Sequence, residues 1–363
     1  MKTITASVKG PPLRRVLCSF LFGAAAFCVV PTNIQAATIQ APGDIVWVTI
    51  GNTIAKFNAN GTAINTNFIT EQPIPMPNSP GAQGFAYVPS LGGIVVSNTT
   101  LYVAAEWIPD MSYVYALLKG LRWMWYINYV IATYDAGTGN LTNSFAHRIS
   151  TSTPQPPHPL APAGMALSVT SYYVANSGGN SITQGGNLLY INSPVTKAPY
   201  ALAVGAVGGP VANVLYVTNN AQNSNGNFYI STYSTANSAN GALLNPSFIE
   251  IATGGLYGLA LSKDNTILYV SVYSGNAPGV YTYNATRGGQ PLHGPLVSVN
   301  EPRGIAIGSP PLNEPNGNPT LYVASYQDSA IYEFDAITGA QLPYSIKVSG
   351  APMNITVEPA AAL

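Results

Sequence analysis

The chain has 363 residues, of which only 7% are charged, and 13 basic residues balance 13 acidic ones. A chain so poor in charge offers neither the basic stripe of a nucleic-acid-binding surface nor a polybasic membrane patch. Both cysteines, Cys18 and Cys28, lie near the N-terminus, so the remainder must be stabilised by its core and not by disulfides. A domain of roughly 300 residues can bury about three quarters of its unfolded surface, which is enough for such a core.

The first 36 residues have the pattern of a secretory signal. Four basic residues precede or begin an apolar run at 16–30, and small residues follow at Ala36 and Ala37. The apolar run is too short for a membrane span. We therefore predict cleavage near Ala36, a secreted, periplasmic or cell-surface protein, and no integral membrane span after cleavage. Residues 37–363 would carry 13 acidic against 9 basic residues, a formal charge of −4.

A repeated four-residue pattern predicts the innermost strands of a β-propeller. Each copy has a small first residue in all but one case, and an Ala or Thr at its third position, as expected where strands crowd around a narrow axis. The six copies begin at Gly84, Gly164, Ala201, Gly258, Gly304 and Asn354. Only 37 residues separate the second copy from the third, which predicts a blade with a reduced outer strand.

The strands that follow each copy also repeat. A Leu-Tyr-Val motif or a close variant begins at Leu101, Tyr172, Leu215, Leu268 and Leu321. The third strands alternate apolar and polar residues, which is typical of strands with two different faces. Two of them end in Asp135 and Asp335, just before a Thr-Gly turn. A carboxylate at that place is expected to cap its own turn.

The two ends of the chain complement each other. The N-terminal part has strands at 45–48, 53–57 and 63–70 but no first strand, whereas 353–358 is a first strand without followers. Pairing them would complete a sixth blade and remove two exposed sheet edges. We therefore predict an all-β, six-bladed propeller of four-stranded antiparallel blades, formed by residues 37–363 as a single domain.

The motif Leu-Tyr-Val-Thr-Asn at 215–219, with Leu-Tyr-Val-Ala-Ser at 321–325, resembles the YVTN and NHL families of β-propeller repeats. The resemblance covers roughly residues 44–359. It implies a six- or seven-bladed propeller of the kind found among exported bacterial proteins. A neighbouring six-bladed family, the gluconolactonase-like sugar lactonases, holds a divalent metal over the channel with Glu, Asn and Asp side chains. The alternative function is therefore that of a metal-dependent, lactonase-like hydrolase.

The residues just before the six innermost strands should ring one mouth of the channel. They are Gln83, Ala163, Tyr200, Tyr257, Arg303 and Met353, and none is a carboxylate. Only Glu301 and Asn354 add oxygen ligands nearby, which is fewer than a hard divalent ion usually takes. We therefore predict no metal site, no cofactor and no catalytic residues.

The mouth is nevertheless a candidate ligand-binding site. Tyr200, Tyr257 and Arg303 could hold an anionic or sugar-like ligand by stacking and charge-assisted hydrogen bonds, with Gln83, Glu301 and Asn354 beside them. In the alternative interpretation the tyrosines plug the channel and Arg303 pairs with Glu301.

A second candidate surface is an aromatic insertion at 107–129. It contains Trp107, Trp123, Trp125 and Tyr126, which would expose apolar surface if they project from a blade. It could equally fold back over a neighbouring blade or the channel. The function predicted from the sequence is that of an exported, non-enzymatic binding or scaffolding propeller. Its ligand would be an unidentified protein or glycan and not nucleic acid, and we expect a monomer.

Overall fold

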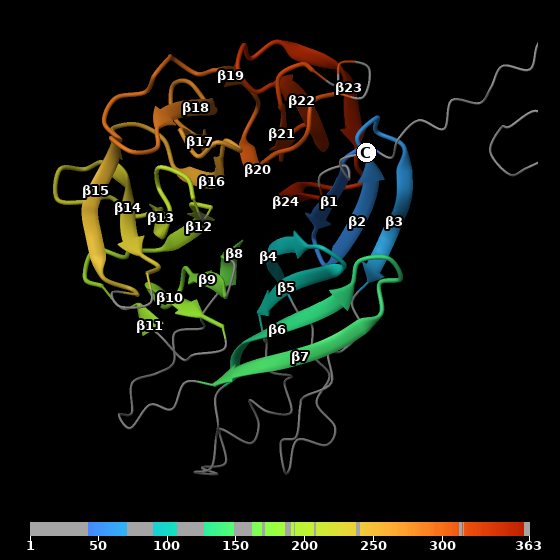
Figure 1. Ribbon diagram of the computed structural model, residues 1–363, viewed down its shortest axis with the longest axis horizontal. Helices are drawn as coiled ribbons and strands as arrows, with labels where there is room; N and C mark the ends of the chain where they lie inside the picture. The colour runs from blue at the N-terminus through green and yellow to red at the C-terminus, as the bar shows by residue number, and fades with distance from the viewer. Residues whose placement is uncertain are drawn as a thin grey trace, which may run out of the picture. The chain divides into compact units, whose positions relative to one another are not determined.

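The computed structural model describes residues 43–70, 90–106, 127–148, 162–168, 171–185, 190–191, 193–206, 208–236, 240–311, 314 and 316–358. All of them belong to one compact unit, residues 41–363. They form six four-stranded antiparallel sheets arranged as a ring (Figure 1), so the prediction of a six-bladed β-propeller is confirmed. The described residues contain no helix that is long and apolar enough to cross a membrane.

The blades are numbered here in chain order, with the blade that contains both chain ends as the sixth. Blade 1 is β4 (Ser90–Ser97), β5 (Thr100–Glu106), β6 (Ile127–Asp135) and β7 (Leu141–Arg148); blade 2 is β8 (Pro162–Leu167), β9 (Tyr172–Asn176), β10 (Ser181–Gln184) and β11 (Tyr190–Ile191); blade 3 is β12 (Pro199–Val204), β13 (Val214–Asn219), β14 (Phe228–Ser234) and β15 (Leu243–Ile251). Blade 4 is β16 (Leu256–Leu261), β17 (Ile267–Val272), β18 (Gly279–Asn284) and β19 (Val297–Ser298); blade 5 is β20 (Pro302–Ile307), β21 (Thr320–Ser325), β22 (Ala330–Asp335) and β23 (Gln341–Lys347); blade 6 is β24 (Pro352–Glu358), β1 (Ile45–Ile50), β2 (Thr53–Asn58) and β3 (Ala63–Thr70). As predicted, the outer strand of blade 2 is reduced, to the two residues of β11.

The innermost strands crowd together, which explains the repeated small residues. Neighbouring strands in the ring are β24, β4, β8, β12, β16 and β20, in that order. A Cβ atom added at Gly258 or Gly304 would lie 2.7 Å from the backbone oxygen of Arg303 or Met353 on the next inner strand. Real Cβ atoms do not come so close, so the repeated small residues are needed where neighbouring inner strands approach one another around the ring axis.

The predicted innermost strand of blade 1 is wrong. Gly84 and the residues after it lie outside the described part, and β4 is the inner strand instead. Ile94 pairs with Val103 as Ile305 pairs with Val323 in blade 5, so Gly93 occupies the position of the small residue that Gly304 occupies in blade 5. The register is set by the tight hairpin between β4 and β5, and a four-residue pattern alone does not carry that information.

The ring closes between the two ends of the chain. β24 pairs antiparallel with β1, with Ile45 opposite Glu358 and Val48 opposite Ile355. The backbone N–H of Asn354 also donates to Thr49 Oγ1 at 3.0 Å. Figure 1 shows the red C-terminal strand beside the blue N-terminal ones, so the prediction that the chain ends build the sixth blade is confirmed.

The tyrosines of the Leu-Tyr-Val motifs connect neighbouring blades. Tyr216 donates from its hydroxyl to the carbonyl oxygen of Ala285 at 2.6 Å, and Tyr269 donates to that of Ala336 at 2.9 Å. Each acceptor follows the last residue of the third strand in the next blade. The hydroxyl of a buried tyrosine usually finds such a partner, and here the partner lies across a blade boundary.

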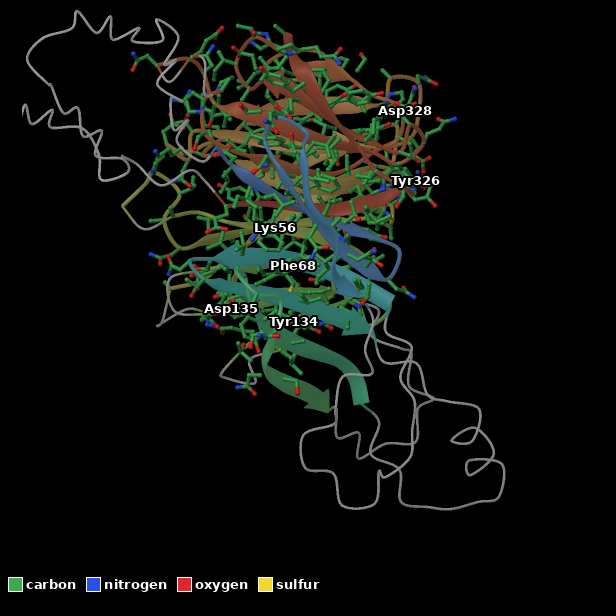
Figure 2. The ribbon with its side chains drawn as sticks, turned by 90° about the vertical axis from the view of Figure 1, so that its right-hand side faces the viewer. Lys56, Phe68, Tyr134, Asp135, Tyr326 and Asp328 are labelled. Carbon is green, nitrogen blue, oxygen red and sulfur yellow. The ribbon has the colours of Figure 1, made fainter. Side chains whose placement is uncertain are left out.

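Blade 6 makes the same connection with different residues. Trp47 takes the tyrosine position, and Lys56 on the paired strand donates from Nζ to the carbonyl oxygen of Ala136 at 2.8 Å. The ammonium lies 4.5 Å from the Trp47 ring centroid and 5.1 Å from that of Phe68. Figure 2 labels Lys56 and Phe68. Burial lowers the pKa of Lys56.

The third strands end in the predicted aspartate-capped turns. Asp335 Oδ1 accepts the backbone N–H groups of Ile337 and Thr338 at 2.9 and 2.7 Å. Asp135 Oδ1 accepts that of Thr138 at 2.7 Å. These carboxylates therefore stabilise their own turns.

Candidate functional site at the channel mouth

The residues predicted to precede the inner strands lie within the first three residues of those strands, where they share one register position. In the described part these are Gly92, Ala163, Tyr200, Tyr257, Arg303 and Met353, each one residue before the small position. Gly92 takes the place predicted for Gln83, which lies outside the described residues. The structure brings Tyr200, Tyr257 and Arg303 together, since the Tyr200 and Tyr257 ring centroids are 4.4 Å apart and the Arg303 guanidinium lies on Tyr257.

Arg303 is surrounded by three tyrosine rings. Its guanidinium carbon lies 4.8 Å from the ring centroid of Tyr257, 4.6 Å from that of Tyr273 and 4.7 Å from that of Tyr326. Tyr257 and Tyr273 meet edge to face, with centroids 6.3 Å apart. A guanidinium within about 6 Å of an aromatic face is attracted by the ring quadrupole, so three rings hold this side chain in place.

Glu301 completes this arrangement, which we call the Arg303 cluster (Tyr200, Tyr257, Tyr273, Glu301, Arg303 and Tyr326). Its carboxylate forms an ion pair with the Arg303 guanidinium. The backbone at Glu301 is left-handed, with φ of 46°, and the Tyr326 N–H donates to its carbonyl oxygen at 3.2 Å. A non-glycine residue in that conformation is strained by about 1–3 kcal/mol, and here the ion pair and the hydrogen bond hold it in place.

The burial of the cluster is graded from the ring axis outward. Tyr257 is 2% exposed, and burial raises the pKa of its hydroxyl. The Arg303 and Glu301 side chains are 16% and 31% exposed, and Tyr326 is 38% exposed. Arg303 Nε is buried without a hydrogen-bond partner among the described residues. Tyr257 is thus packed in the interior, whereas Tyr326 faces solvent.

Two further predicted mouth residues have structural contacts. Asn354 donates from Nδ2 to the Gly92 carbonyl oxygen at 2.8 Å, which links blade 6 to blade 1. The Tyr257 hydroxyl donates toward Met353 Sδ at 3.8 Å. The described residues contain no group of three His, Cys, Asp or Glu side chains placed to hold a metal ion. The aromatic residues predicted in the insertion, Trp107, Trp123, Trp125 and Tyr126, lie outside the described part.

The sequence-based prediction missed Tyr273 and Tyr326. Each stands four residues after the tyrosine of a Leu-Tyr-Val motif, in two consecutive blades, where Asn220 stands in blade 3. Alignment of the second strands beyond the motif would therefore have found both. Their proximity to Arg303 could not be foreseen in this way, because it depends on how β20 lies beside the turns of blades 4 and 5.

Comparisons with known proteins support the fold. No protein-family model matches the sequence, and no curated protein matches it. Among solved structures, a chain of a nidogen/laminin complex is similar with a TM-score of 0.56 and 13% identity, over 88% of this chain and 99% of that one. A putative 6-phosphogluconolactonase from Bacteroides fragilis has a TM-score of 0.48 and 16% identity, over 88% and 99% of the two chains.

A gluconolactonase from Xanthomonas campestris has a TM-score of 0.43 and 16% identity, over 62% of this chain and 70% of that one. Of these three structures, the nidogen/laminin chain alone has a TM-score above 0.5, and at 13% identity its likeness concerns the fold alone. The protein is therefore a six-bladed β-propeller, and the predicted resemblance to propeller repeat proteins holds at the level of architecture.

Proposed function

We propose that the chain is an exported, non-enzymatic binding propeller that recognises a protein or glycan through the Arg303 cluster. The observation that carries the proposal is the guanidinium held between the rings of Tyr257, Tyr273 and Tyr326 at the end of the inner strands. The basic and apolar pattern of residues 1–36 supports export.

The chemistry of the cluster suits recognition. Tyrosine and arginine are enriched among residues that dominate binding energy, and rigid side chains lose little entropy on binding. Glu301 balances the Arg303 charge, so the cluster does not require an anionic ligand. The exposed ring of Tyr326 can stack on an apolar side chain or on the face of a sugar.

The insertion predicted at 107–129, whose last three residues belong to β6, remains the second proposed surface. Its tryptophans, Trp107, Trp123 and Trp125, would add apolar contact area to a bound partner.

Tyr326→Ala tests the proposal, with Tyr344→Ala as its matched control. Tyr344 is 43% exposed on β23 of the same blade, outside the cluster. Labelled protein of residues 37–363 is applied to arrays of immobilised glycans and extracellular proteins. We expect at least one ligand to bind the parent and the Tyr344→Ala variant alike. Tyr326→Ala should bind it about 30-fold more weakly, as for a residue worth about 2 kcal/mol.

Two results would contradict the proposal. Equal binding by both variants would remove the Arg303 cluster from recognition. Hydrolysis of a sugar lactone that depends on an added divalent metal, with no array ligand bound, would establish the lactonase alternative.

A further inference from the structure

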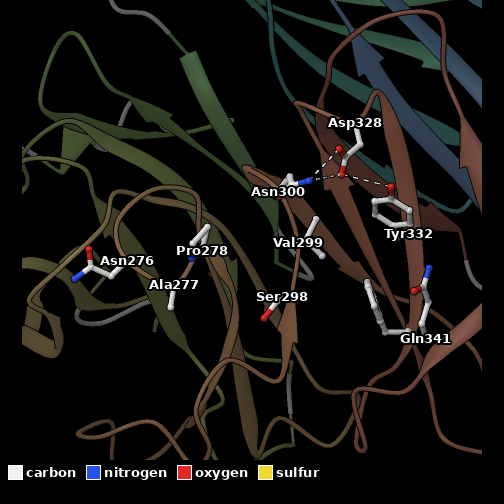
Figure 3. A pocket seen from close by; sticks show the side chains of 10 residues that line it. Asn276, Ala277, Pro278, Ser298, Val299, Asn300, Asp328, Tyr332 and Gln341 are labelled. Carbon is white, nitrogen blue, oxygen red and sulfur yellow. Dashed lines mark hydrogen bonds between the residues drawn. The ribbon is translucent and has the colours of Figure 1, made fainter.

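A pocket of about 640 Å³ lies between blades 4 and 5, and no residue of the Arg303 cluster lines it. Its lining residues, most of which Figure 3 labels, come from the turn between β17 and β18, the segment from β19 to β20, the turn between β21 and β22, and the strands β22 and β23. The buried side chains of Val299 and Phe334, 7% and 6% exposed, give it apolar surface. Its volume is within the range of small-molecule sites.

One wall carries an ordered polar network. Asn300 donates from Nδ2 to Asp328 Oδ1 at 3.1 Å, and Tyr332 donates from its hydroxyl to Asp328 Oδ2 at 3.4 Å (Figure 3). Ser325 Oγ lies 2.7 Å from the same oxygen. Lys347 Nζ, which is not among the lining residues, lies 5.6 Å from the Tyr332 ring centroid. The carboxylate and the aromatic ring are thus positioned before any ligand arrives.

The other polar groups of the pocket have unused hydrogen-bonding capacity. The side-chain amides of Asn276 and Gln341 and the hydroxyl of Ser298 are exposed and form no hydrogen bond within the described part of the chain. Each amide offers two donors and a carbonyl acceptor. Together with Asp328 and Asn300, they present mixed donors and acceptors around a half-buried tyrosine.

This composition excludes several ligand classes. No cationic side chain is among the described residues that line the pocket, and Asp328 would repel an anion. A hard metal ion would find one carboxylate whose oxygens already accept hydrogen bonds. A purely apolar ligand would leave the amides and the carboxylate without water, which costs free energy.

We infer that this pocket binds a neutral sugar residue. The hydroxyl groups of a sugar both donate and accept, which matches the amides of Asn276, Asn300 and Gln341 and the carboxylate of Asp328. Its apolar C–H face matches the ring of Tyr332. This second site is separate from the Arg303 cluster, and its occupation does not depend on the function proposed for that cluster.

The test is saturation-transfer NMR on residues 37–363. The probes are D-glucose, D-galactose, D-mannose, L-fucose and N-acetyl-D-glucosamine, each at millimolar concentration. Gln341→Trp fills the pocket from an exposed position, and the double variant Asn276→Ala/Gln341→Ala removes two free amides. Gln290→Ala, an exposed glutamine of blade 4 outside the pocket, is the matched control.

We expect a saturation-transfer signal from at least one neutral sugar with the parent protein, with Gln290→Ala and with Tyr326→Ala. Binding should be at least tenfold weaker in Gln341→Trp and in the double variant. The inference would be overturned if none of the five sugars gave a saturation-transfer signal. It would also be overturned if the signal were as strong in both pocket variants as in the parent. A thermal shift with sodium phosphate or calcium chloride that is lost in the pocket variants, without sugar binding, would overturn it as well. Loss of sugar binding in Tyr326→Ala alone would place the sugar at the Arg303 cluster instead.

Discussion

Two buried carboxyl groups meet where blade 5 contacts blade 6. Glu333 on β22 and Asp44, just before β1, are each 3% exposed. Asp44 Oδ2 accepts the Ser309 N–H at 2.7 Å and the Tyr322 hydroxyl at 3.3 Å, whereas Glu333 Oε1 has no hydrogen-bond partner in the described part. Burial, and then the charge of Asp44, raise the pKa of Glu333 to about 8.

This pKa predicts a stability that falls as the pH rises. Because the folded-state pKa lies above the ordinary value of 4.5, the native protein holds one proton more than the unfolded chain between about pH 4.5 and pH 8. Each unit of that difference is about 1.4 kcal/mol, so the loss across the window is a few kcal/mol. We expect Glu333→Gln to remove this loss, as measured by urea unfolding at pH 5 and pH 8. The exposed Glu314→Gln should keep the parent's pH profile, and a Glu333→Gln profile parallel to it would contradict the assignment.

At the level of secondary-structure elements, the outer turns of four blades lie against the preceding blade. Four turn glycines have positive φ values, and a Cβ on each would lie within 3 Å of a backbone oxygen of the preceding blade. The pairs are Gly61 with Ser345, Gly139 with Phe68, Gly288 with Phe248 and Gly339 with Leu296, at 2.8, 2.9, 2.2 and 2.3 Å. These glycines are therefore required by a close approach as well as by their own backbone conformation.

Gly339→Ala tests this contact, with Gly226→Ala as the matched control. Both glycines have positive φ, 73° and 79°, but nothing lies within 4 Å of a Cβ built on Gly226. We expect Gly226→Ala to cost about 1 kcal/mol of unfolding free energy, from backbone conformation alone. Gly339→Ala should cost about 2–4 kcal/mol, because the Leu296 carbonyl must also move. Equal losses in urea unfolding would show that the turn contact contributes nothing.

At the scale of the whole molecule, stability depends on closing the ring. β24 pairs with β1 and lies between the inner strands β4 and β20. Without β24, β1 would expose its hydrogen-bonding edge to solvent. The side chains of Val46, Trp47 and Val48, which are fully buried, would also become more exposed.

Deletion of residues 351–363 should therefore be far more damaging than its length suggests. Each buried side chain uncovered costs about 1.5–3 kcal/mol, so we expect a melting temperature lower by about 10 °C or more. Deletion of residues 359–363, which follow β24, is the control and should leave the melting temperature unchanged. If the two truncated proteins have the same melting temperature, closure by β24 does not stabilise the ring.

How much of this could be predicted differs between parts of the molecule. The Leu-Tyr-Val and Gly-apolar-Ala repeats predicted the blades and the position shared by Tyr200, Tyr257 and Arg303. They could do so because each repeat indicates which residues of a strand occupy equivalent positions in the other blades. The same pattern misplaced the inner strand of blade 1 at Gly84, since an isolated match contains no pairing partner. It also missed Tyr273 and Tyr326, which approach Arg303 from turns of two blades.

The architecture follows from the amino-acid sequence, because strand alternation, turn residues and small residues at the axis act over a few positions and their repetition is visible in one chain. The contacts between blades depend on the folded ring. Lys56 does in blade 6 what Tyr216 and Tyr269 do elsewhere, and Asp44 meets Tyr322 from 278 positions away. Such pairs form because ring closure brings distant positions together, and no local periodicity records them.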